Sequence, residues 1–372
     1  MVKMSLSTFD AAIIGGGPAG LAAAIAIRRK GLSVVVIDRA VPPIDKPCGE
    51  GLMPDGVDAL SRLGIAVGTD EHVPFWGIRF IQEGTSTEGY FPEGHGLGIR
   101  RTTLHQILVK GALDAGASLL WGAHVTGISH DGVEIGDGTV RCRWIVAADG
   151  QNSRSRKWMD LDARTIERLR FGFVRHLAVA PWTDFVEVYW GDDCQVVITA
   201  VGPGEICATL ATHNPKFRLE AALESLPALS DRIQGAKTIG RERGAVCGLR
   251  VLARVAWGRF AAVGDASGSV DSLTGEGVCL AFRQALWLAD AIAANDLSLY
   301  ASAHRKLARM PVLISRLMLA MDRHAGLRQL TLRALEAHPR LFSRIVAAHV
   351  AANRPGKVAP GLPGPGWQYL MD

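Results

Sequence analysis

The chain has 372 residues, of which 48% are hydrophobic, and its formal net charge is +5. This length and composition supply enough apolar surface for buried cores in two domains. The basic residues are dispersed, and the absence of a run of five or six of them argues against a nucleic-acid-binding arm. The six cysteines form no CxxC pair and show no spacing typical of metal ligands. We therefore expect reduced thiols, no metal site, no nucleic-acid partner and a cytoplasmic protein.

A glycine-rich turn follows the first apolar run, where residues 11–20 read AAIIGGGPAG. Glycines at 15, 17 and 20 have GxGxxG spacing, and the next apolar run, 32–37, ends at Asp38. In such a unit the glycines make the turn, admit a pyrophosphate and let helix and strand pack closely, while the carboxylate binds a ribose hydroxyl. The pattern predicts a dinucleotide site, FAD or NAD rather than NADP, formed by Gly15, Gly17, Pro18, Ala19, Gly20, Asp38 and Arg39.

The uncharged stretch 11–27 has a second interpretation, as a signal peptide or a membrane helix. Glycines and a proline interrupt the stretch near its start, and an aspartate precedes it. No other stretch approaches the roughly 18 apolar residues of a spanning helix. We expect no integral membrane segment.

Two later motifs have the same strand-to-turn character. An apolar strand ends at Asp149-Gly150, which an ordinary strand and turn would also explain. A second strand leads into Gly264-Asp265, and the segment 274–277, TGEG, then opens a long apolar helix. The Asp265 carboxylate could hold a sugar-like hydroxyl, and amides near Gly275 and Gly277 could face an anionic oxygen.

With GxGxxG, Asp-Gly and Gly-Asp in this order, the chain resembles the flavoprotein hydroxylases of the p-hydroxybenzoate hydroxylase fold, over roughly residues 9–300. The resemblance implies non-covalent FAD, a small-molecule substrate, and NADPH or NADH as electron donor. It implies that Arg101 lies over the phosphates and Asp265 binds the ribityl chain. The other cofactor contacts expected from it are Cys48, Val125, Asp149, Gly150, Gly264, Gly275, Glu276 and Gly277.

The implied fold class is α/β. We expect a discontinuous Rossmann-type FAD-binding domain over 9–72, 99–165 and 248–300, with an inserted antiparallel β substrate domain over 73–98 and 166–247. C-terminal helices over 301–353 and a Pro/Gly-rich tail over 354–372 complete the chain. The amphipathic stretch 307–324 could lie on a membrane surface, but we favour a helix packed on the body of the protein. Peripheral membrane contact and oligomeric state are left open.

The reaction has three interpretations. The favoured one is an NAD(P)H-dependent monooxygenase that hydroxylates an apolar or aromatic small molecule through a hydroperoxide at flavin C4a. The segment 46–51, KPCGEG, instead resembles the geranylgeranyl reductase branch, which saturates isoprenoid double bonds, although the aromatic-rich segment of those reductases is missing. The third is a flavin-binding scaffold without turnover.

Cys48 and Glu50 are the candidate catalytic residues. The plainer interpretations are a packing thiol for Cys48 and solvated loop carboxylates for Glu50 and Glu276. We expect an apolar substrate pocket between the inserted sheet and the flavin, lined by residues 185–210 and reached past Pro47 to Pro54.

Overall fold

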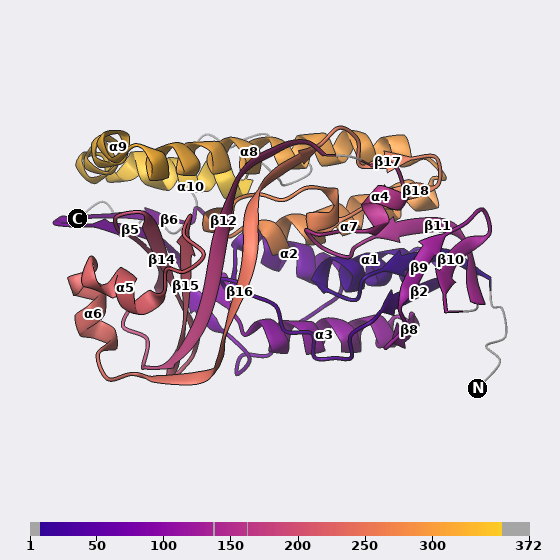
Figure 1. Ribbon diagram of the computed structural model, residues 1–372, viewed down its shortest axis with the longest axis horizontal. Helices are drawn as coiled ribbons and strands as arrows, with labels where there is room; N and C mark the ends of the chain where they lie inside the picture. The colour runs from indigo at the N-terminus through magenta and orange to yellow at the C-terminus, as the bar shows by residue number, and fades with distance from the viewer. Residues whose placement is uncertain (1–7, 137, 162, 352–372) are drawn as a thin grey trace.

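The computed structural model describes residues 8–136, 138–161 and 163–351. Two large β-sheets lie at opposite ends of an elongated molecule, with a layer of helices between and above them (Figure 1). Two 16-residue strands, β12 (Ala163–Ala178) and β16 (Lys237–Leu252), run side by side and link the part of the molecule that carries the first sheet to the second sheet.

The first sheet has the strand order β17-β18-β11-β1-β2-β8. Its strands are β1 (Phe9–Ile14), β2 (Val34–Asp38), β8 (Ser118–Trp121), β11 (Gly138–Ala147), β17 (Ala256–Trp257) and β18 (Phe260–Ala262). The short strands β9 (Val125–Ile128) and β10 (Gly132–Ile135) extend β11 as a hairpin. β1 pairs in parallel with β2 on one side and with β11 on the other. Ligands of open parallel sheets bind beyond the carboxyl ends of such central strands.

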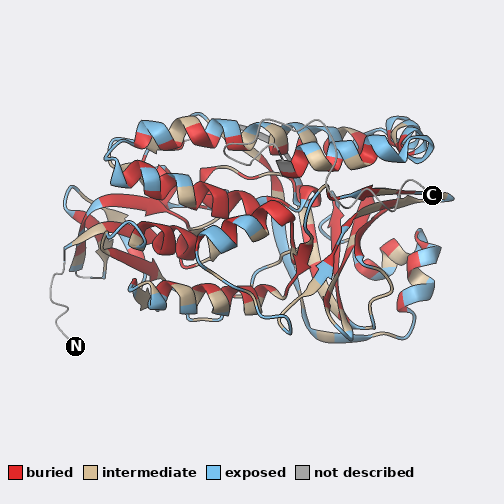
Figure 2. Cartoon of the chain, turned by 180° about the vertical axis from the view of Figure 1, so that it is seen from behind, coloured by how far each residue is buried: buried red, intermediate tan, exposed pale blue. Residues whose placement is uncertain are grey.

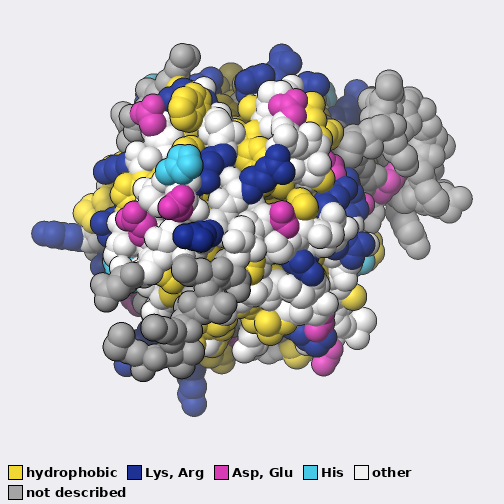
Figure 3. Space-filling view, turned by 90° about the vertical axis from the view of Figure 1, so that its right-hand side faces the viewer, with side chains coloured by type: hydrophobic (Ala, Val, Ile, Leu, Met, Phe, Trp, Pro, Cys, Tyr) yellow, Lys and Arg dark blue, Asp and Glu magenta, His cyan; other side chains and the backbone are white. Residues whose placement is uncertain are grey.

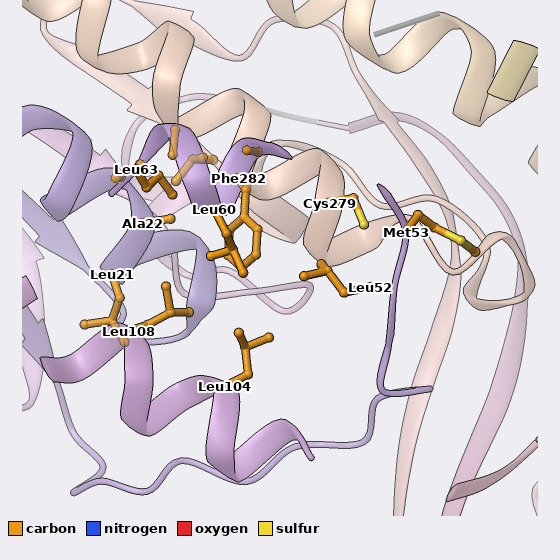
Figure 4. Close-up of a cluster of buried hydrophobic side chains, with 14 of the residues drawn as sticks. Leu21, Ala22, Leu52, Met53, Leu60, Leu63, Leu104, Leu108, Cys279 and Phe282 are labelled. Atoms are coloured by element: carbon orange, nitrogen blue, oxygen red, sulfur yellow. The ribbon is translucent and has the colours of Figure 1, made fainter. Parts of the chain in front are cut away.

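Helices α1 (Pro18–Arg28), α3 (Arg101–Asp114) and α7 (Gly277–Ala293) pack around this sheet. The alanine-rich helix α1 is buried along nearly its whole length, because small side chains let it lie close to α7. Figure 2 shows this buried centre in red, beneath outer helices with exposed faces. In Figure 4, Leu52 and Met53 lie beside Cys279 of α7, and Leu104 and Leu108 of α3 face the same core. The loop before Leu52 is therefore anchored on the core of the first sheet.

The second sheet has the order β16-β12-β15-β14-β13-β5-β6. Besides β12 and β16, its strands are β5 (Gly77–Gln82), β6 (Thr85–Tyr90), β13 (Phe185–Trp190), β14 (Cys194–Gly202) and β15 (Glu205–Thr212). All its pairs are antiparallel except β13 with β5, which run parallel. A small third sheet joins β3 (Gly51–Leu52), β7 (Gly96–Gly98) and β4 (Val73–Phe75). The α/β fold class is confirmed, with this one parallel pair as a departure from a purely antiparallel second sheet.

The C-terminal helices are α8 (Leu297–Arg323), α9 (Ala325–Ala337) and α10 (Pro339–Ala351). Leu307, Met318 and Met321 of α8 are buried, as expected for a packed amphipathic helix, whereas Leu313 is 59% exposed. None of the described helices is sufficiently long and apolar to cross a bilayer. The expected tail, 354–372, lies outside the described residues.

The remaining elements are short. They comprise α2 (Pro54–Arg62), α4 (Ser155–Trp158), α5 (Leu219–Glu224), α6 (Pro227–Ile233) and two 3-10 turns, η1 (Gly264–Ser267) and η2 (Ser272–Thr274).

At the end of the molecule that carries the first sheet, Lys and Arg side chains are interspersed with Asp and Glu (Figure 3).

Candidate functional site

The glycine-rich turn lies at the carboxyl end of β1, and its glycines have different roles. Gly15 has φ +114°, and an added Cβ would lie 2.4 Å from the carbonyl oxygen of Ala148. A Cβ on Gly20 would lie 1.9 Å from the carbonyl oxygen of Gly15. A Cβ on Gly17, which caps α1, would meet nothing within 4 Å. Gly15 and Gly20 thus permit close packing, and Gly17 leaves space for a ligand at the helix N-terminus.

Asp38 ends β2 beside this turn. The Gly16 N–H donates to Asp38 Oδ2 at 2.7 Å, and the Ala40 N–H donates to Oδ1 at 2.8 Å. Each carboxylate oxygen can still accept a second hydrogen bond, so the side chain can bind ribose hydroxyls. Arg39 is exposed next to it, and Val125 is buried at the start of β9. The roles of these residues in cofactor binding stay predictions.

His105 contacts the glycine-rich turn, and no motif in the sequence predicted this role. Its Nδ1 accepts from the Ile44 N–H at 3.4 Å, so its Nε2 donates to the carbonyl oxygen of Gly16 at 2.8 Å. Burial lowers the pKa of His105 and favours this neutral form. Its position four residues after Arg101, on the same face of α3, was the only signal in the sequence.

Arg101 begins α3 and is 5% exposed. Its Nη1 has no hydrogen-bond partner among the described residues, and burial lowers the pKa of its guanidinium. A buried cation with an unsatisfied donor is costly unless an anion completes it. Arg101 therefore fits a phosphate-bearing cofactor, and this fit agrees with the open space at Gly17.

The Gly264-Asp265 motif meets the glycine turn directly. Gly264 has φ +61°, its N–H donates to Gln284 Oε1 at 2.7 Å, and an added Cβ would lie 2.6 Å from that of Ala19. The Asp265 side chain is exposed, yet the protein around it desolvates the carboxyl and raises its pKa, while the charges of Lys46, Arg250 and Arg101 oppose that shift. The geometry leaves the Asp265 carboxylate available for a hydroxyl of the cofactor.

In the Asp149-Gly150 motif, the carboxylate accepts hydrogen bonds from the turn that follows it. Asp149 Oδ2 accepts from the N–H groups of Arg154 and Ser155 at 3.0 and 3.1 Å, and from Ser155 Oγ at 2.9 Å. Gly150, with φ +83°, turns the chain. The carboxylate thus fixes the turn before α4, and a direct contact of Asp149 with FAD or a pyridine nucleotide remains a prediction.

The Glu276 side chain lies in a buried environment instead of the solvated loop that was expected. Its side chain is fully buried, with Oε1 3.1 Å from His349 Nε2 and Oε2 3.6 Å from Arg283 Nη2. Arg283 also pairs with Asp55 at 2.6 Å. The interpretation of Glu276 as a solvated loop carboxylate is wrong, because α2, α7 and α10 enclose it. Gly275, with φ +66°, and Gly277, whose Cβ position is open, leave only their backbone to face a ligand.

Cys48 and Glu50 lie where the second sheet meets the loop after β2. Glu50 is buried, so its solvated interpretation is wrong as well. Its Oε1 accepts from the Arg101 N–H at 2.7 Å, its Oε2 lies 2.7 Å from His176 Nε2 of β12, and its N–H donates to Cys48 Sγ at 3.4 Å. Glu50 has φ +59°, an uncommon conformation that this set of contacts holds in place.

A second thiol completes this cluster. Cys207 of β15 donates to the carbonyl oxygen of Cys48 at 3.6 Å. Burial raises the pKa of the Cys48 thiol, and that of the Cys207 thiol well above its usual value. Ligand atoms of Glu50, His176 and Cys207 lie within 4.8 Å of one another, but metal binding would require the disfavoured thiolate. Side-chain and backbone hydrogen bonds thus bring Cys48, Glu50, His176 and Cys207 together, and we call these four residues the Glu50 cluster.

The cavity found near this junction differs from the expected one. It is lined by residues of the loop 45–50, by Arg100, and by β12 and β16. The expected walls from residues 185–210 do not contribute to it, and its lining is basic rather than apolar. The reason is that β14 and β15 pack directly against the Cys48–Gly51 loop, with Thr199 and Thr209 approaching its glycines.

Comparison with known proteins identifies the family. The model of the FAD binding domain family matches residues 8–297. The chain belongs to this family. The Mycobacterium tuberculosis menaquinone reductase is 37% identical over 155 residues, which span 39% of this chain and 38% of that protein. The menaquinone reductase of Mycolicibacterium smegmatis is 29% identical over 79% of this chain and 78% of its own length.

Other proteins that resemble this chain are named for different reactions. Two Streptomyces proteins named as monooxygenases, one acting on tetracyclines and one on rifampicin, are 29% and 28% identical over about two-fifths of this chain and 33% of their own length. A flavoprotein/dehydrogenase from Cytophaga hutchinsonii superposes with TM-score 0.80 over 94% of both chains at 15% identity, which shows a shared fold. The family and the fold therefore agree with the features of the site that fit FAD, namely the open space at Gly17, the buried Arg101 and the available Asp265 carboxylate.

Proposed function

We propose that this protein is an FAD-dependent oxidoreductase that reduces a carbon–carbon double bond in the isoprenoid chain of a lipid. The Glu50 cluster is the observation that carries the proposal, because it brings proton-carrying groups to the junction of the second sheet with the cofactor motifs. Menaquinones carry isoprenoid chains, so the relatives named menaquinone reductases support this substrate class. The KPCGEG segment, which resembles the geranylgeranyl reductase branch, contributes two members of the cluster.

Saturation of an alkene requires a hydride at one carbon and a proton at the other. FAD, once bound and reduced by NADPH or NADH, would supply the hydride. The chain supplies the proton. Burial raises the pKa of the Cys48 thiol, so it stays protonated at neutral pH and is a donor rather than a nucleophile. The Glu50 N–H, 3.4 Å from Cys48 Sγ, stabilises the thiolate left after transfer.

Solvent must return the proton that Cys48 gives up, because the contact between Cys48 Sγ and Glu50 is to the Glu50 backbone N–H. Glu50 and His176 are in direct contact at 2.7 Å, and both line the cavity at the sheet junction. Water that enters this cavity would be the source of the proton. Cys207 and Thr209 of β15 lie against the Cys48–Gly49 segment, and Cys48 itself is partly exposed, so solvent can reach it.

The second candidate is an NAD(P)H-dependent monooxygenase, the activity that the sequence analysis favoured. The Streptomyces monooxygenases that match this chain support it. We place it second because the Glu50 cluster has a role in delivering a proton to an alkene, whereas hydroxylation assigns none to the Cys48 thiol.

The mass of the product separates the two candidates. FAD-loaded protein, reduced without oxygen, is incubated with menaquinone or geranylgeranyl diphosphate, and the product is analysed by mass spectrometry. The proposal predicts a gain of two hydrogens in the isoprenoid chain under anaerobic conditions. A product that forms only in air and carries one atom from ¹⁸O₂ would instead establish the monooxygenase. Reduction of the quinone ring alone would also contradict the proposed substrate bond.

A further inference from the structure

The cavity beside the Glu50 cluster has a volume of about 100 Å³. A cavity needs only about 10–15 Å³ by this measure to hold one water, so it has room for a group of several heavy atoms. Its charged lining is dominated by cations. The four basic side chains are Lys46, Arg100, Arg241 and Arg243, against two carboxylates, Asp45 and Glu50.

A bulge in β16 shapes one wall of the cavity. Val174 of β12 pairs with Arg243 and His176 pairs with Ile239, so β16 has two more residues than β12 between these pairs. Gly240 allows the distortion through its φ of +74°. Bulges re-aim side chains and are frequent next to active sites. This one places Gly240 and Arg241 on the cavity wall.

The acidic residue of the bulge does not face the cavity. Glu242 lies next to Arg241 in sequence but does not line the cavity. It accepts from Arg175 at 2.7 Å and lies 3.3 Å from Arg218 Nε. The bulge therefore separates opposite charges: Arg241 contributes to the cavity wall while exposed to solvent, and two other arginines hold Glu242.

Two of the four cations are already paired. Arg243 contacts Asp45 at 2.6 Å, and Arg100 contacts Glu205 at 2.7 Å. Glu50 is engaged by His176 and by the Arg101 N–H. Among the described residues no ion pair is found for Arg241 or Lys46. Both side chains are exposed, and the charge of Lys46 acts on Asp265. The cavity thus presents one cation, Arg241, that no described carboxylate compensates, a setting that favours an anionic group of a ligand.

We propose that this cavity binds the phosphate or diphosphate group of a ligand whose reactive part reaches the flavin, with Arg241 as the main contact. The inference rests on the FAD site of the proposed function but not on which reaction occurs there. Two sources share this chemistry: the diphosphate of a pyridine nucleotide donor and that of a prenyl diphosphate substrate. The bidentate guanidinium of Arg241 suits phosphate oxygens better than a lysine would.

The first test uses inorganic pyrophosphate as the probe. Isothermal titration of FAD-loaded protein should show one site, and Arg241→Ala should raise its Kd about tenfold or more, because a charge-assisted contact is lost. Arg241→Lys should recover part of the affinity. Lys237→Ala is the matched control, since Lys237 is an exposed cation on the same strand that does not line the cavity. Absence of saturable binding, or equal effects of Arg241→Ala and Lys237→Ala, would overturn the proposal.

The second test identifies the source of the phosphate. Anaerobic reduction of the protein-bound flavin is followed over a range of NADPH concentrations, and binding of geranylgeranyl diphosphate is measured by titration. A raised half-saturating NADPH concentration in Arg241→Ala assigns the site to the donor, and weakened prenyl diphosphate binding assigns it to the substrate. If neither ligand responds to Arg241→Ala, the assignment to a reacting ligand is wrong. These readouts do not measure alkene reduction, so failure of the proposed function leaves them interpretable.

Discussion

Two clusters that each contain a buried glutamate lie near the flavin motifs, and they differ in their access to a cavity. Each joins a carboxylate to a histidine: Glu50 to His176 at 2.7 Å, and Glu276 to His349 at 3.1 Å. The Glu50 cluster borders a cavity between a loop and the second sheet. The Glu276 cluster, which we define as Asp55, Glu276, Arg283 and His349, is enclosed by α2, α7 and α10.

This difference changes how perturbed pKa values are interpreted. Burial raises the pKa of Asp55 to about 6 and that of Glu276 to about 7, and it lowers the pKa of His349 to about 4. Shifts of this kind often mark catalytic groups. Here the enclosed cluster, which joins the C-terminal helix to the Gly275 turn, carries them, as do the Cys48 and Cys207 thiols of the Glu50 cluster. Access to a ligand, rather than the size of a pKa shift, therefore distinguishes the chemical cluster from the structural one.

The largest expected effect comes from removing the shared cation of the Glu276 cluster. Arg283→Met leaves two carboxylates buried without their ion-pair partner, so we expect the free energy of unfolding to fall by about 3–5 kcal/mol. Urea unfolding followed by circular dichroism measures it. A loss below about 1 kcal/mol would show that the cluster is open to water.

The matched substitution at the cofactor site should affect binding instead of stability. Arg101 is as deeply buried as Arg283, but its Nη1 has no partner among the described residues. Arg101→Met should leave the unfolding free energy of FAD-free protein unchanged or higher, because a desolvated cation is removed. The Kd for FAD, measured by flavin fluorescence, should rise about tenfold to a hundredfold. Unchanged FAD affinity would remove Arg101 from the phosphate site.

The two histidines allow a direct comparison of the clusters. His349→Ala should lower the free energy of unfolding by about 1–3 kcal/mol, because a buried imidazole that packs 3.1 Å from the Glu276 carboxylate is removed. His176→Ala should cost less, since cavity water can replace its contact with Glu50. Thermal unfolding of both variants beside the wild type tests this order. The reverse order would contradict the distinction between the enclosed and the accessible cluster.

The pH dependence of stability should report Glu276. Its folded pKa is raised above the unfolded value, so its stabilising contribution is present at low pH and is lost as pH rises through about 7. Relative to Glu276→Gln, wild-type protein should lose about 1 kcal/mol of unfolding free energy between pH 6 and pH 8. Both proteins retain Asp55 and His349, so their titrations largely cancel in the difference. A difference that does not change with pH would show that Glu276 is ionised throughout.

The motifs that depend on local geometry could be predicted from the sequence. Gly15 and Gly264 adopt positive φ, and Asp38 ends a strand, so each position is constrained by its immediate neighbours. The family resemblance, the α/β class and the C-terminal helices followed from such local patterns. The parallel pairing of β13 with β5 did not, because pairing between distant strands leaves no mark in either strand alone.

The chemistry of the clusters depends on packing between distant segments. His176 reaches Glu50 across 126 positions of sequence, and His349 reaches Glu276 from the last described helix. No spacing rule connects such residues, so both glutamates were interpreted as solvated. The basic cavity was missed for a similar reason, since a two-residue bulge in β16 places Arg241 there.

The origin of the transferred proton tests the central claim most directly. Protein reduced without oxygen is mixed with an isoprenoid substrate in D₂O for a single turnover, and deuterium in the product is located by mass spectrometry. We predict one deuterium at the carbon that receives the proton. We also predict that Cys48→Ala slows product formation about a hundredfold with FAD still bound, while Cys142→Ala, at a buried thiol in the first sheet, leaves the rate unchanged. Equal rates in wild type and Cys48→Ala, or a saturated product without solvent deuterium, would contradict the account.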